Sequence, residues 1–155
     1  MYPIQGQARI KFMVNIILRW VAVLPLSVLA AWLAFVIAQG VFGLVVYFMG
    51  FDPEGLLPTV YKNTMPHFLM GGALIASGCS LAPSYKRQVV IILLFLLILH
   101  GLGAFIFVGI KLDFSPSTIN YWAALGGTFE VVGAALVSYT VWSGEKDTRR
   151  LKESP

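Results

Sequence analysis

The chain has 155 residues and a mass of 17.0 kDa, is 58% hydrophobic and only 12% charged, and carries a formal net charge of +4. A soluble domain usually has about 25% charged residues, so this composition excludes a disordered chain and a coiled coil and favours an integral membrane protein. The bases do not alternate with aromatic residues on a polar surface, so no nucleic-acid partner is expected. The single cysteine, Cys79, excludes an internal disulfide and a cysteine-based metal cluster.

Four segments are long and apolar enough to be membrane-spanning helices, each of which needs about 20 residues. The first span, about 21–49, is longer than a bilayer requires, and Pro25 near its start predicts a kink. The second span, about 66–82, is short and lies between two prolines. The third span, about 89–110, is the most apolar, and the fourth covers about 121–142.

The segments between the spans are polar and rich in turn-forming residues. We expect connections at 52–65, 83–88 and 111–120, and a charged tail at 143–155 that is a solvated helix extension or a frayed end. Lys and Arg are concentrated on one side of this topology, which places both termini in the cytoplasm. The nine bases on that side are Arg9, Lys11, Arg19, Lys86, Arg87, Lys146, Arg149, Arg150 and Lys152, against Lys62 and Lys111 on the other.

The predicted fold class is therefore all-α. We expect residues 1–155 to form one domain, an antiparallel bundle of four transmembrane helices, with a charged cytoplasmic tail after the last span. The expected location is the cell membrane, as in small multi-pass proteins of the bacterial inner membrane. Its surroundings would be the lipid bilayer together with other membrane subunits or further copies of the chain.

Two ionisable residues lie deep in the predicted spans. His100 is the twelfth residue of the third span and Glu130 the tenth of the fourth. Because the two spans run antiparallel, both residues fall in one layer near the midplane, within about 2 Å in depth. An ionisable group at that depth costs several kcal/mol unless it is paired or hydrated, so this intramembrane pair is the first functional candidate.

Small residues surround Glu130 at helical spacing and indicate close helix packing. A matching small surface lies on the second span, so spans two, three and four are expected to pack around the pair, with the first span lying apart. Gln39 is the polar residue that the first span contributes. The residues expected to pack are Gly126, Gly127, Gly133 and Ala134 on the fourth span, and Gly71, Gly72 and Ala76 on the second.

Several interpretations of the pair stay open. Glu130 and His100 could form a buried hydrogen bond or ion pair that fixes helix register, could relay protons or cations, or could contact a lipid or quinone. His67 is expected at the outer boundary, in the first turn of its span and about 15 Å from the depth of His100. A haem shared by the two histidines is therefore not expected, and neither a cofactor nor a metal site is predicted.

Three classes of function fit these features. We favour a non-catalytic membrane protein that works by association, as a homo-oligomer or as a subunit of a larger complex, because four short helices leave little interior for an active site. The alternative is a small proton- or cation-coupled transporter or channel that uses Glu130 and His100. An enzyme is the least favoured class because no catalytic constellation is visible.

Overall fold

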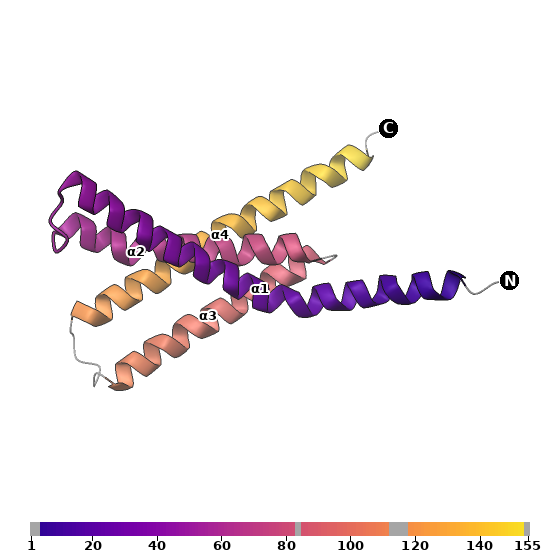
Figure 1. Ribbon diagram of the computed structural model, residues 1–155, viewed down its shortest axis with the longest axis horizontal. Helices are drawn as coiled ribbons and strands as arrows, with labels where there is room; N and C mark the ends of the chain where they lie inside the picture. Colours follow the sequence, from indigo (N-terminus) through magenta and orange to yellow (C-terminus); the bar gives the residue numbers. More distant parts are fainter. Residues whose placement is uncertain (1–3, 83–84, 112–117, 154–155) are drawn as a thin grey trace.

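The computed structural model describes residues 4–82, 85–111 and 118–153, and in these residues it is all-helical. Its four helices are α1 (Ile4–Met49), α2 (Leu56–Leu81), α3 (Lys86–Lys111) and α4 (Thr118–Glu153). Successive helices run back and forth along the long axis of the molecule (Figure 1). The start of α1, the end of α2, the start of α3 and the end of α4 therefore lie toward the same end, which we call the basic end because most Lys and Arg residues are in these segments.

Three of the four helices contain a stretch long and apolar enough to cross a membrane, namely Ile16–Met49, Lys86–Gly103 and Tyr121–Gly144. The sequence predicts four such spans, and α2 is not among the three. Its first half holds the polar run from Lys62 to Thr64, which lowers the apolar character of the helix as a whole.

The turn between α1 and α2 is closed by backbone hydrogen bonds. Gly50 has a φ of 64°, which ends α1 in the left-handed conformation, and the Phe51 N–H donates to the Val46 carbonyl over 3.2 Å. The Glu54 N–H donates to Asp52 Oδ1 and the Gly55 N–H to the Asp52 carbonyl, each over 3.0 Å. The chain is therefore turned by residue 55, and α2 begins at once.

The early start of α2 corrects the expected connection at 52–65. Pro58 is the third residue of the helix, where its missing N–H is not needed for an intrahelical bond. The polar side chains that follow bond to their own helix: Asn63 Nδ2 donates to the Thr59 carbonyl over 2.7 Å, and the Thr64 hydroxyl donates to the Val60 carbonyl over 2.8 Å. These polar residues are part of a helix, so the prediction of a connection that extends to residue 65 is wrong.

α2 is the central helix and contacts each of the other three. α1 packs along it: Phe42 stacks on Tyr61 with ring centroids 4.4 Å apart, and Phe35 meets the His67 ring edge-on at 5.2 Å. The expectation that the first span lies apart from the others is therefore wrong. Aromatic side chains on α1, which sequence spacing alone does not pair with a partner, hold the two helices together.

α1 is long, about 69 Å at the usual rise of about 1.5 Å per residue. Pro25 lies inside it, and the helix axis changes direction part of the way along (Figure 1). A proline removes one backbone hydrogen bond and crowds the preceding turn, which is the usual cause of such a bend. The Ser27 hydroxyl, which is fully buried, donates to the Val23 carbonyl in the same region.

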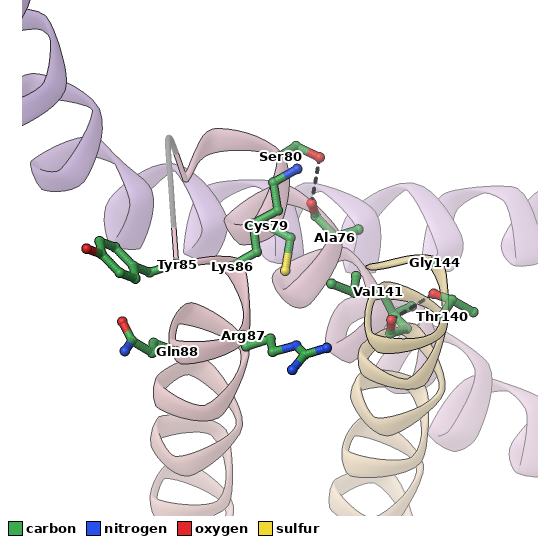
Figure 2. Close-up of a pocket in the computed structure, with 11 residues that line it drawn as sticks. Ala76, Cys79, Ser80, Tyr85, Lys86, Arg87, Gln88, Thr140, Val141 and Gly144 are labelled. Carbon is green, nitrogen blue, oxygen red and sulfur yellow. Dashed lines mark hydrogen bonds between the residues drawn. The ribbon is translucent and has the colours of Figure 1, made fainter. Parts of the chain in front are cut away.

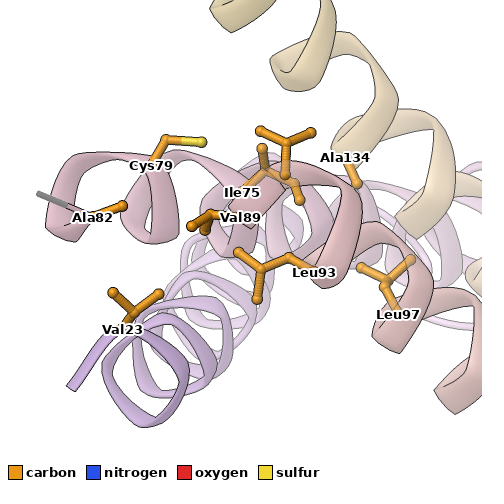
Figure 3. Packing of buried hydrophobic residues seen from close by; sticks show 9 residues of the cluster. Val23, Ile75, Cys79, Ala82, Val89, Leu93, Leu97 and Ala134 are labelled. Atoms are coloured by element: carbon orange, nitrogen blue, oxygen red, sulfur yellow. The ribbon is translucent and has the colours of Figure 1, made fainter. Parts of the chain in front are cut away.

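The hydrophobic core draws residues from all four helices and lies toward the basic end (Figures 1 and 3). Gly78 marks the point where three helices meet, because a Cβ there would run into the Leu93 side chain of α3 and lie 3.2 Å from Ser27 Oγ of α1. The buried members of this core are Val23, Ile75, Cys79, Ala82, Val89, Val90, Leu93, Leu97 and Ala134.

Candidate functional site

α2 and α4 cross with their backbones in direct contact. A Cβ on Gly71 would lie 2.8 Å from the Glu130 carbonyl carbon and closer still to its oxygen. A Cβ on Gly133 would lie 2.9 Å from the Phe68 carbonyl carbon, again with the oxygen closer. The arrangement is reciprocal, because each glycine lies against a backbone carbonyl of the other helix. In both cases that carbonyl belongs to the residue three positions before the other helix's glycine. Such glycine crossings let two helices approach more closely than any larger residue allows.

The other residues expected to pack differ in how closely they contact a neighbouring helix. Ala134 is fully buried in the core, and Gly126 lies under the His67 ring, whose Nε2 would be 3.0 Å from a Cβ. Gly72 has ordinary room, with Val137 Cγ2 at 3.4 Å. By contrast, Gly127 would have no non-local heavy atom within 4 Å of a Cβ. Ala76 is exposed.

Glu130 is buried at the α2–α4 crossing, with 8% of its surface exposed, whereas His100 on α3 is exposed. Both residues line two neighbouring cavities, of about 600 Å³ and about 340 Å³. In the described part of the chain no hydrogen bond or ion pair joins them. The structure thus brings the two residues to one place without pairing them directly, and Met70 of α2 lines both cavities beside them.

His67 belongs to the same site, which the sequence analysis did not predict. It is the twelfth residue of α2 because the helix begins at Leu56, so the expectation that it lies in the first turn is wrong. Its ring packs on Gly126, one turn before Glu130, and it lines the larger cavity with His100. The two histidines, expected about 15 Å apart in depth, therefore border one space.

A sequence signal for His67 does exist. Asn63, His67 and Gly71 follow one another at intervals of four residues, so they lie on one face of any helix that includes all three. Asn63 and Gly71 both meet α4 in the structure, as His67 does. A helix that begins at Leu56, ten residues before Pro66, places this histidine at the crossing.

The site offers a carboxyl group and two imidazoles around a mostly apolar cavity. The Nδ1 atom of His67 is buried and has no hydrogen-bond partner in the structure. The Thr128 hydroxyl, which also borders the cavity, donates to the Ala124 carbonyl over 2.8 Å. Groups of this kind can exchange protons or hydrogen-bond to one polar group of a ligand or a neighbouring helix. Among the described residues no three His, Cys, Asp or Glu side chains form a cluster that could hold a metal ion.

Gln39 lies outside this site. Its Nε2 donates to the Lys62 carbonyl over 3.3 Å, which ties the second half of α1 to the first half of α2. Its neighbours in that region are the stacked rings of Phe42 and Tyr61. The arrangement makes Gln39 part of the α1–α2 contact.

No protein-family model, no curated protein and no solved structure matches the chain. The class that the structure itself defines is an all-helical protein in which three helices are long and apolar enough to cross a membrane.

Proposed function

We propose that the chain is an integral membrane protein with four spans and both termini in the cytoplasm, in a membrane such as the bacterial inner membrane. Three apolar helices, the back-and-forth course of the chain and the bases gathered at one end support this topology. α2 fits as the fourth span because it is enclosed by contacts with the other three helices, and its polar side chains bond to their own helix.

Within the membrane, the protein would work by association, as a homo-oligomer or as a non-catalytic subunit of a larger complex. The supporting observation is the larger cavity, where Glu130, His67 and His100 border a space that the chain's own helices leave unfilled. Ionisable groups beside such a space cost several kcal/mol when they face hydrocarbon. A helix from a second copy or another subunit, seated along Gly127, would cover them.

The alternative function is a proton or cation path. It is favoured by a separate observation, namely that Glu130, His100 and Met70 line both cavities and so lie where the two spaces adjoin. Water entering the cavities would connect the carboxyl group with both imidazoles. In that case the polar groups would be hydrated and would need no partner helix.

Filling the cavity tests the association proposal. A Cβ at Gly127 has no non-local neighbour within 4 Å, so the side chain of a Gly127→Leu variant should occupy the space without a clash. The variant should then associate less, and the mass of the oligomer measured by light scattering in detergent should fall. Gly40→Leu on α1, where a Cβ is equally free, is the control and should leave the mass unchanged. A chain that is monomeric both in detergent and after mild extraction from its native membrane would contradict association.

Flux measurements test the alternative. In proteoliposomes loaded with a pH-sensitive dye, a relay predicts proton flux that Glu130→Gln abolishes while the oligomeric state is kept. Glu54→Gln, which alters an exposed acid in the α1–α2 turn, is the matched control and should retain the flux. Absence of flux from the wild-type protein would count against the relay and in favour of association.

A further inference from the structure

Another cavity lies at the basic end, between the end of α2, the start of α3 and the last turns of the apolar stretch of α4 (Figure 2). Its volume is about 960 Å³. It shares no lining residue with the two cavities beside Glu130. It therefore constitutes a separate candidate binding site.

The charged residues in the described lining of this cavity are both bases. Lys86 and Arg87 line it from α3, and none of the described residues that line it is acidic. Figure 2 shows Arg87 extending toward α4 and Lys86 toward the end of α2, so the two bases reach toward different walls. An anion in the cavity would meet charge from two directions, as phosphate groups commonly do in proteins.

The remaining lining suits a molecule that is only partly polar. Val137 and Val141 of α4 provide an apolar wall beside the bases. The hydroxyls of Ser80 and Thr140 donate to carbonyls of their own helices, over 2.8 Å to Ala76 and 2.7 Å to Val137. Because these hydroxyls are already engaged, recognition of a ligand here is expected to depend on the charge of the bases more than on a pattern of hydroxyl donors.

We infer that this cavity binds an anionic phospholipid, with its phosphate between Lys86 and Arg87 and its acyl chains along the valines of α4. The inference rests on the membrane placement proposed above, since the bases at the cytoplasmic end of the spans would then lie at headgroup depth. It does not depend on association or transport. Basic cavities between helices at this depth are the usual places where acidic headgroups bind.

Lipid binding to the full-length protein in a neutral detergent tests the inference, with native mass spectrometry as the measurement. Phosphatidylglycerol should bind at least about tenfold more tightly than phosphatidylcholine, because each base contributes about fivefold. Lys86→Gln should weaken phosphatidylglycerol binding about fivefold, whereas Lys86→Arg should retain it. Lys62→Gln, which removes an exposed base at the opposite end, is the matched control and should have no effect.

Three results would overturn the inference. Equal affinity for the two lipids would show that charge does not select the ligand. An equal loss in Lys62→Gln and Lys86→Gln would show a general effect of net charge. Displacement of the lipid by soluble glycerol 3-phosphate at similar concentration would assign the cavity to free phosphate esters. Release of the protein from its native membrane by a carbonate wash would instead refute the membrane placement, so the two failures are distinguishable.

Discussion

The glycine crossing of α2 and α4 makes a sharp prediction about stability. Gly71→Ala adds a methyl group that would lie 2.8 Å from the Glu130 carbonyl carbon and closer to its oxygen. A backbone carbonyl cannot rotate away as a flexible side chain can, so α2 and α4 must move apart. Gly72→Ala, at the next residue of the same helix, meets Val137 Cγ2 at 3.4 Å and the Gly133 carbonyl oxygen at 3.7 Å, both ordinary contacts, and serves as the control.

The comparison removes the effect of helix propensity. Replacing glycine by alanine in a helix gains up to about 1 kcal/mol, and this gain is shared by both variants. Overpacking a close contact costs about 1–3 kcal/mol, and only Gly71→Ala incurs that cost. We therefore expect Gly71→Ala to be less stable than Gly72→Ala by about 1–3 kcal/mol.

Reversible unfolding in mixed micelles with increasing sodium dodecyl sulfate, followed by circular dichroism, measures this difference. Gly133→Ala should behave like Gly71→Ala, because its methyl group would meet the Phe68 carbonyl. The double variant should lose less than the sum of the two, since the first substitution already separates the helices. A difference in the free energy of unfolding between Gly71→Ala and Gly72→Ala below about 0.5 kcal/mol would refute the backbone contact, because stability changes at independent sites already deviate from additivity by that amount.

Two further predictions concern the turns and the α1–α2 contact. Tyr85 is exposed and has a φ of 55°, so Tyr85→Gly should raise the free energy of unfolding by about 1 kcal/mol. The control Gln88→Gly, inside α3, should lower it by a similar amount. Stabilities equal to wild type in both variants would show that Tyr85 carries no strain. Phe42 and Tyr61 stack at 4.4 Å, and a double-mutant cycle with leucine at each position should give a coupling energy of about 0.5–1.5 kcal/mol, while zero coupling would mean that the rings do not stack.

The apolar runs of α1, α3 and α4 allow these helices to be predicted from the sequence, whereas the first half of α2 could not be. This half contains residue types that are common in loops, namely Pro58, Lys62, Asn63 and Pro66. In the helix Pro58 falls in the first turn, where its missing N–H is not needed, Pro66 lies inside the helix, and the polar side chains find acceptors on their own turns. Whether a polar residue is solvated or bonded locally depends on its neighbours in space, and composition does not contain that information.

The candidate site shows the same limit. Glu130 and His100 stand out in the sequence because ionisable groups are rare within apolar runs. His67 does not, because its depth depends on where α2 begins. The small residues on both helices predict that α2 and α4 pack, but the sequence does not show that Gly71 meets the Glu130 carbonyl itself, because that pairing depends on how the two helices cross.

The glycine crossing and the cavity beside it have a common cause. The distance between two packed helices is set by the side chains at their contact, and glycines on both α2 and α4 bring these two helices unusually close. α3 makes no such close approach there, because a Cβ on Gly101 or Gly103 would meet no non-local heavy atom within 4 Å, and Gly101 borders the open cavity. The space around Glu130 therefore follows from unequal helix spacing, and a substitution that loosens the crossing should change the surroundings of Glu130 as well as the stability of the fold.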